Sequence, residues 1–99
     1  MSQAPASVRI PAELRELLPR FLASRRGEVA QLRAAAAGGD FDTARRIGHV
    51  LKGVGGGYGF DEITRLGGEI ERRAARGEEI GGLVEALGAY LDSVTVTFE

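Results

Sequence analysis

The stretch Asp40–Gly59, DFDTARRIGHVLKGVGGGYG, contains the clearest helical pattern in the chain. Its apolar residues recur at alternating spacings of three and four: Ala44, Ile47, Leu51, Val54 and Tyr58. At 100° per residue these positions cluster on one side of a helix, so the pattern predicts an amphipathic helix with one buried face. Asp40 is suited to the N-cap of this helix, and Gly59 to its end.

Similar patterns flank this helix on both sides. Residues 21–36 carry an apolar stripe that predicts a helix ending at Gly38 and Gly39. On the other side we expect Asp61 to cap a helix that Gly77 closes, and residues 80–94 to form the last helix. A shorter helix is expected from Pro11, with Pro19 breaking or restarting it.

The short connections between these helices determine the expected fold. Short connections favour antiparallel neighbours, so we predict an all-α fold: an antiparallel up-down-up-down four-helix bundle with a short extra N-terminal helix. Residues 1–99 are expected to form a single domain, with residues 1–10 as a frayed lead-in. The tail Val94–Glu99 alternates apolar and polar residues. Because one alternating segment cannot form a sheet, we expect it to fray or to extend along the bundle.

Composition excludes several classes of function. The chain has 99 residues and a formal net charge of -1, which argues against nucleic-acid binding. It has no cysteine, and it shows no secretory signal and no apolar run of the roughly 20 residues that a membrane span needs. We therefore expect a cytoplasmic protein without a membrane partner. The preference for arginine over lysine, with abundant alanine and glycine, suggests a GC-rich bacterial genome.

His49, the only histidine, lies opposite the apolar face of the predicted central helix. Arg45 and the only lysine, Lys52, flank it at i−4 and i+3, while Gly53 and Gly56 follow at i+4 and i+7. Glycine in a helix interior costs about 1 kcal/mol relative to alanine. The glycines are therefore interpreted as bare backbone that lets another molecule approach closely, the alternative being that Gly53–Gly59 is a flexible loop.

An exposed imidazole beside cations suits the transfer of a phosphoryl group. Neutral imidazole is a nucleophile at physiological pH. A phosphoryl group on it would carry about two negative charges, which Lys52 and Arg45 could partly offset. The bare backbone would let a second protein place its active site over His49.

The run His49–Phe60 resembles the signature of the histidine phosphotransfer (HPt) domain family. In that signature, leucine, lysine and glycine follow the phospho-accepting histidine at +2, +3 and +4, and a large apolar residue and a glycine follow at +9 and +10. The matching residues here are Leu51, Lys52, Gly53, Tyr58 and Gly59. The resemblance extends to Gly39-Asp40 before the helix and to the apolar helix from Leu66 to Glu71 after it. Gly55-Gly56-Gly57 departs from the family, in which serine and alanine are more usual.

This resemblance implies a fold and a function. The family fold is an antiparallel four-helix bundle. His49 would accept and donate the phosphoryl group through Nε2, Lys52 would favour the phosphorylated state, and Gly53 would keep the approach clear. Arg45 and Gly56 would contact the partner.

The implied partners are a response-regulator receiver domain and a hybrid histidine kinase. The receiver would supply an aspartate and a divalent cation, so the chain itself is expected to need no cofactor and to be a phosphocarrier rather than an enzyme. No supporting polar residue follows from the resemblance; the candidates on the next helix are Arg65, Arg72 and Arg73. Arg25, Arg26 and Arg33 are candidates for the edge of the docking surface.

Other chemistries lack the residues they need. One histidine cannot complete a hydrolytic triad without a nearby nucleophile, nor a histidine-based zinc site. The glycine run contains neither nucleotide-loop motif and follows a helix rather than a strand. Two rival hypotheses remain: a helical adaptor that binds a receiver or kinase without carrying phosphate, and an obligate homodimer held through Val94–Phe98. We expect a monomer.

Overall fold

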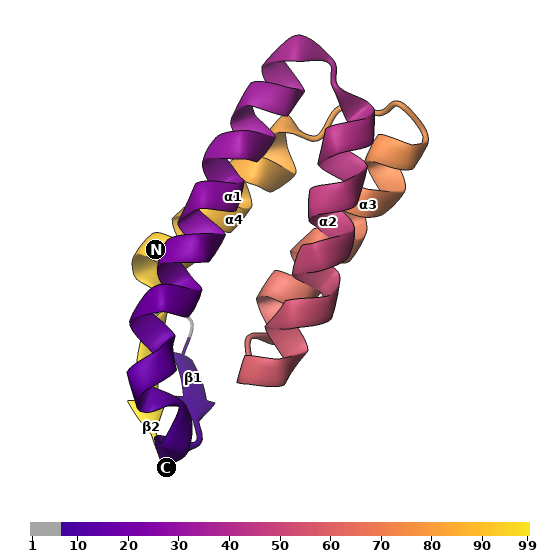
Figure 1. Cartoon of the computed structure of the whole chain (residues 1–99). Coiled ribbons are helices and arrows are strands. Elements are labelled where there is room, and N and C mark those ends of the chain that lie inside the picture. Colours follow the sequence, from indigo (N-terminus) through magenta and orange to yellow (C-terminus); the bar gives the residue numbers. More distant parts are fainter. Residues whose placement is uncertain (1–6) are drawn as a thin grey trace, which may run out of the picture.

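Helices dominate the part of the chain that the computed structural model describes, residues 7–99 (Figure 1). Within this range there are four α-helices, two 3₁₀ helices and two strands. In chain order they are β1 (Ser7–Ile10), η1 (Ala12–Leu17), α1 (Leu18–Gly38), α2 (Phe41–Gly55), η2 (Gly56–Tyr58), α3 (Asp61–Ala75), α4 (Gly81–Ser93) and β2 (Thr95–Phe98). The prediction of a mostly helical fold is confirmed.

The ends of α2 follow from its sequence. The Asp40 side chain accepts a hydrogen bond from the Thr43 backbone N–H at 3.2 Å, which confirms its role as N-cap. Gly39 ends α1 in the left-handed conformation, with φ of 66°. At the other end α2 tightens into η2, and Gly59 then turns the chain with φ of 82°. Gly53–Gly59 therefore holds helical structure up to this turn rather than a flexible loop.

The other helix starts differ in part from expectation. Pro19 lies in the first turn of α1, where a missing backbone N–H costs nothing. The segment after Pro11 is the 3₁₀ helix η1, which runs directly into α1. Asp61 does not cap α3: Phe60 holds the N-cap position, and Asp61 is the first helical residue. Its carboxylate still favours this helix end, because the N-terminal end of a helix dipole is positive.

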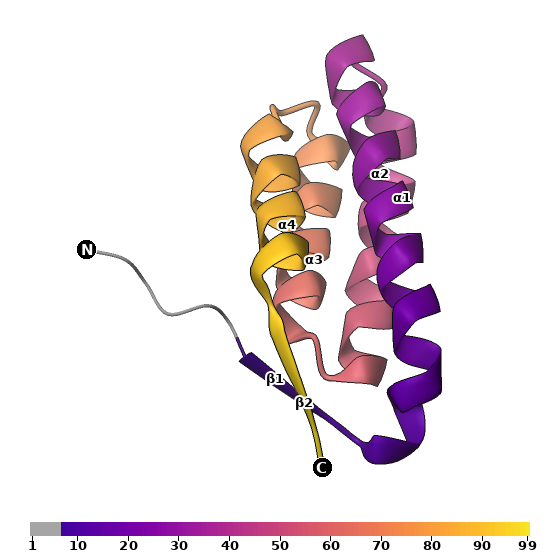
Figure 2. The same ribbon diagram turned by 90° about the vertical axis from the view of Figure 1, so that its left-hand side faces the viewer.

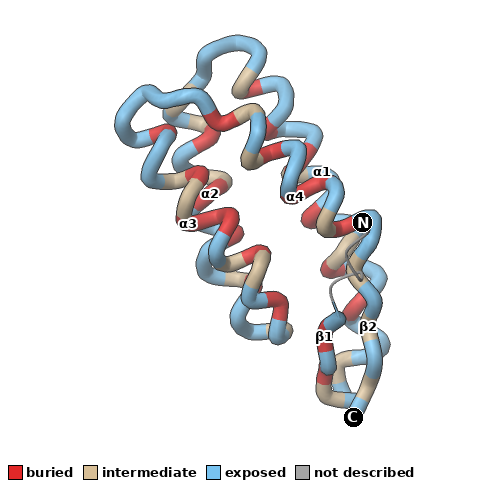
Figure 3. Tube along the Cα trace, turned by 180° about the vertical axis from the view of Figure 1, so that it is seen from behind, coloured by how far each residue is buried: buried red, intermediate tan, exposed pale blue. Residues whose placement is uncertain are grey.

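The four helices pack around one apolar core. Helix α1 lies beside α2 and α4, and α3 also lies beside these two helices, as Figures 1 and 2 show. Buried positions recur along each helix between exposed ones (Figure 3). The largest fully buried side chains include Leu32, Leu51, Phe60, Ile70 and Leu87. Their burial accounts for the apolar spacing in the sequence.

Helices α2 and α3 make the most extensive contact, and glycines allow it. A Cβ atom added to Gly48 would lie 2.7 Å from the Glu71 backbone nitrogen and 2.8 Å from the Gly67 carbonyl oxygen. One added to Gly67 would lie 2.6 Å from Leu51 Cβ. Both positions are too close for any side chain, so the two backbones touch here. This contact sets how the residues of α2 and α3 face each other.

The chain ends form a sheet that the sequence did not predict. Strands β1 and β2 pair in parallel, with Ser7 opposite Thr95 and Ile10 opposite Phe98. Residues 7–10 are therefore not frayed, and the tail is neither frayed nor simply extended along the bundle. Each segment supplies the neighbouring strand that the other needs for its backbone hydrogen bonds. Ile10 is fully buried, which anchors the ladder to the core. Residues 1–6 of the expected lead-in lie outside the described residues.

No helix among the described residues combines the length and apolar character needed to cross a bilayer.

Replacing Gly48 by alanine should destabilise the protein. Its Cβ would meet the backbone of α3, and overpacking of this kind costs about 1–3 kcal/mol. Gly27→Ala in α1 is the matched control, since no described atom beyond the adjoining helix backbone lies within 4 Å of its added Cβ. The control should gain up to about 1 kcal/mol through helix propensity. Urea denaturation followed by circular dichroism measures both; equal shifts in the two variants would contradict the close contact.

Candidate functional site

His49 lies on the solvent-facing side of α2. Its side chain is 67% exposed, whereas Leu51, two residues later, is fully buried. The helical periodicity places it there, because the apolar residues of α2 turn the opposite face inward. The expected exposure of His49 is confirmed.

Glu71 of α3 bridges His49 and Lys52. His49 Nδ1 lies 2.8 Å from Glu71 Oε2, and Lys52 Nζ lies 3.0 Å from Glu71 Oε1. Each carboxylate oxygen thus serves one partner. The contact of Gly48 with the Glu71 backbone brings α3 close enough for this bridge. The site is therefore a His49–Glu71–Lys52 cluster across two helices.

The charge of Glu71 determines how the imidazole is held. Hydrogen bonding from Lys52, and then from His49, lowers the pKa of the Glu71 carboxyl below its usual range. Glu71 is therefore ionised at neutral pH and can only accept hydrogen bonds. It follows that Nδ1 carries a proton, and that in the neutral ring Nε2 keeps its lone pair and faces away from the carboxylate.

This cluster also makes the site sensitive to acid. The pKa of Glu71 is lower in the folded chain than in the unfolded one, so its contribution to stability is present above the usual glutamate pKa. That contribution is lost as the pH falls through the lowered folded-state pKa. The bridge thus remains intact throughout the neutral range.

The glycines after His49 fall into two groups. Apart from the adjoining backbone, no described atom lies within 4 Å of a Cβ added to Gly53 or Gly57, and at Gly56 only Thr64 Oγ1 comes within that distance, at 3.9 Å. Gly55 differs: its added Cβ would lie 2.8 Å from the Phe60 carbonyl oxygen. Gly55 is thus buried in the contact with α3 and is not part of the open surface. Gly53, one turn after His49, leaves bare backbone beside the imidazole.

The other cations near the site are engaged with neighbouring carboxylates. Arg45 is exposed on α2 and pairs with Asp42 at 3.0 Å. The three candidates on α3 also pair within their own helix, Arg65 with Glu62, and Arg72 and Arg73 with Glu69. The α3 side chain that contacts His49 is therefore Glu71, a residue that sequence reasoning missed. It follows Gly67 by one turn, so the glycine that marks the contact with α2 also indicates which acidic residue faces His49.

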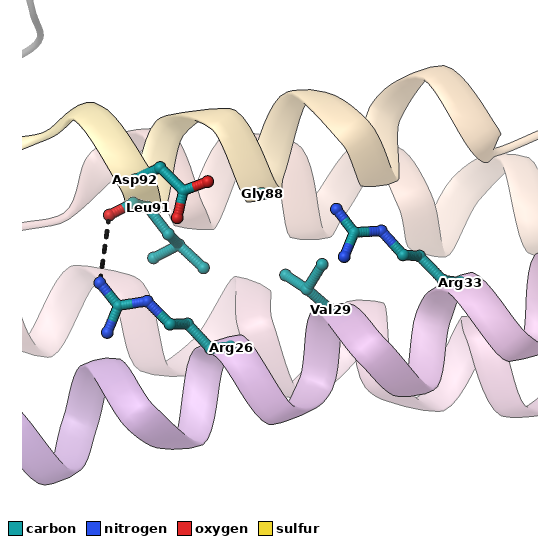
Figure 4. A pocket seen from close by; sticks show the side chains of 6 residues that line it. All are labelled: Arg26, Val29, Arg33, Gly88, Leu91 and Asp92. Carbon is teal, nitrogen blue, oxygen red and sulfur yellow. Dashed lines mark hydrogen bonds between the residues drawn. The ribbon is translucent and has the colours of Figure 1, made fainter.

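Two of the three candidate arginines of α1 lie away from this site. Arg25 is buried and pairs with Glu28. Arg26 and Arg33 instead line a hollow of about 140 Å³ between α1 and α4, together with Val29, Gly88, Leu91 and Asp92 (Figure 4). This seam lies on the side of the bundle away from the α2–α3 contact, as Figure 1 shows. The expectation that they adjoin the His49 surface is wrong for Arg26 and Arg33.

Within residues 7–99, no group of three or more histidine and acidic side chains is placed to hold a metal ion. The fold and the site define a helical bundle that presents one solvent-facing imidazole, oriented by a carboxylate and accompanied by an ammonium group. The family model of the Hpt domain matches residues 16–95, and the chain belongs to this family. Hpt domains are phosphocarrier modules of two-component signalling, rather than enzymes in the usual sense, and they interact with receiver domains and kinases. No curated protein and no solved structure matches the chain.

Removing the Glu71 carboxylate should change the tautomer of His49. In the wild-type protein the neutral ring should carry its proton on Nδ1. In Glu71→Ala the neutral ring should become a mixture with a substantial population protonated on Nε2. Long-range ¹H–¹⁵N NMR spectra of the ring nitrogens distinguish these forms. Identical spectra in both proteins would show that Glu71 does not orient the imidazole.

Proposed function

We propose that this chain is a histidine phosphotransfer protein. It relays a phosphoryl group between receiver-domain aspartates, from a hybrid histidine kinase to a response regulator, through a phosphohistidine at His49. The observation that carries this proposal is the His49–Glu71 hydrogen bond, which leaves Nε2 free on an imidazole that is 67% exposed. Family membership supports the same reaction.

The cluster supplies what the transfer requires of the carrier. The Nε2 lone pair attacks the phosphorus of the receiver aspartyl phosphate; the N–P bond forms as the bond between phosphorus and the aspartate oxygen breaks. The ring becomes positively charged, and the Glu71 carboxylate at Nδ1 offsets that charge. Lys52 lies one turn along the same face and places positive charge beside the incoming phosphoryl group. The reverse path delivers the group to the next aspartate.

The surface around His49 suits the docking of a receiver. Gly53 offers open backbone, and Val50, which is 46% exposed, adds an apolar contact. Arg45 and Gly56 extend the same surface along α2 and η2. The receiver contributes the aspartate and a divalent cation, so the carrier needs no cofactor, ATP site or metal site of its own.

Several wider features belong to the same proposal. The helices form an antiparallel up-down-up-down bundle over a single domain, which the short connections and the chain reversals in Figures 1 and 2 support. The protein is a monomer in the bacterial cytoplasm; its preference for arginine, with abundant alanine and glycine, supports the bacterial origin.

His49→Gln should abolish phosphoryl uptake. Mixing the wild-type protein with a ³²P-labelled receiver domain should give an acid-labile, base-stable adduct, and the variant should form none because its amide is not a nucleophile. Uptake of the label by His49→Gln at the wild-type rate would contradict the proposal. Binding of the receiver that ignores both His49 and phosphorylation would instead favour an adaptor without phosphate.

Gly53→Glu should block docking while leaving the fold intact. The new side chain would add bulk and negative charge beside His49, and like-charge juxtaposition at an interface costs enough to slow transfer by about tenfold or more. Gly82→Glu at the start of α4 is the matched control, because its added Cβ also meets no described atom within 4 Å beyond the adjoining backbone. Stopped-flow transfer assays compare the two; equal rates would refute close approach over Gly53.

A further inference from the structure

Gly68 of α3 lies directly under the side chain of Lys52. A Cβ atom added at Gly68 would lie 3.3 Å from Lys52 Cδ and 3.7 Å from Lys52 Cγ. The next nearest atom, at 3.9 Å, is Arg72 Nη1. All three are side-chain atoms, and Gly68 is itself buried by them.

The surroundings of Gly68 differ from those of the neighbouring Gly67. At Gly67 the nearest atoms include the Lys52 backbone nitrogen at 2.7 Å and the Gly48 carbonyl oxygen at 2.9 Å, so that position must be glycine for the helices to meet. At Gly68 a methyl group would meet only side-chain atoms: the stem of Lys52 and, at 3.9 Å, the Arg72 guanidinium. Since the Lys52 side chain is 49% exposed, the stem can move outward. Packing of the backbone therefore does not explain Gly68, and alanine would favour the helix more.

We propose that Gly68 is a positioning residue for Lys52. Because Gly68 has no side chain, the methylenes of Lys52 lie directly against α3 at this position, and Nζ reaches Glu71 Oε1 at 3.0 Å. The ammonium is thereby held one turn from the nucleophilic imidazole instead of swinging in solvent. This inference rests on the proposed phosphotransfer function for its kinetic consequence, but its structural part does not.

The position of the Lys52 stem against Gly68 affects the His49–Glu71–Lys52 cluster directly. Glu71 divides its two oxygens between Lys52 and His49. A methyl group at position 68 would push the Lys52 stem outward by a few tenths of an ångström, and we expect this shift to weaken the hold of the carboxylate on the ammonium. The positive charge would then be spread over many rotamers when a phosphoryl group arrives, and the entropy of fixing one of them would slow the transfer.

The test compares Gly68→Ala with Gly27→Ala. Gly27 is a helical glycine in α1 whose added Cβ meets no described atom within 4 Å beyond the adjoining helix backbone. Together with Lys52→Met and the double variant Gly68→Ala/Lys52→Met, Gly68→Ala forms a double-mutant cycle. In the unphosphorylated proteins, ¹³C NMR titration follows the Glu71 carboxyl. Its pKa should rise in Gly68→Ala, in the direction seen in Lys52→Met, and should not rise further in the double variant. Gly27→Ala should match the wild type.

Transfer kinetics give the second readout. Gly68→Ala should take up label from a phosphorylated receiver severalfold more slowly than the wild type, with an unchanged or higher melting temperature. In the Lys52→Met background the same substitution should have no further effect. An unshifted Glu71 titration in Gly68→Ala would overturn the proposal, as would an equal slowing with and without Lys52. Failure of Gly68→Ala to fold would also overturn it, because the space would then serve packing. The titration is independent of phosphotransfer, so it separates this inference from the function tested by His49→Gln.

Discussion

The backbone contact between α2 and α3 is the constraint on which the rest of the site depends. Gly48 and Gly67 remove the two side chains that would hold the helices apart, and the carboxylate of Glu71 then comes within hydrogen-bonding distance of both His49 and Lys52. A wider separation would leave the imidazole in free rotation on an exposed helix. Packing and chemistry are therefore linked at this contact. The glycines that let α3 approach α2 also position Glu71, which orients the imidazole of His49.

The glycine content of this chain has more than one physical origin. Gly39 and Gly59 adopt left-handed backbone that other residues avoid. Gly48, Gly55 and Gly67 are needed for backbone contact, whereas Gly53 leaves a surface open. These roles cannot be separated by composition, and they meet within a single helix hairpin. The same residue type thus serves turning, packing and access within a few turns of one another.

The sequence predicted the elements whose causes are local. The spacing of Ala44, Leu51 and their neighbours predicted α2, Asp40 predicted its cap, and the position of His49 opposite the apolar face predicted its exposure. What it did not predict depends on contacts between distant segments. Strand β1 has only four residues, and its partner lies at the other end of the chain, so neither half signals a sheet alone. Glu71 lies 22 residues from His49, and only the register between two helices brings it there.

The parallel pairing of β1 and β2 also determines how the protein responds to mechanical force. Because the two strands run in the same direction, tension applied at residue 7 and at residue 99 pulls them lengthwise past each other. The hydrogen bonds of the ladder then share the load instead of breaking one by one from an end. Stacking of the Arg15 guanidinium on the Phe98 ring at 4.6 Å adds a second attachment at the same end of the bundle. The helices between the two strands, among them α2 with His49, therefore bear little of this tension while the ladder holds.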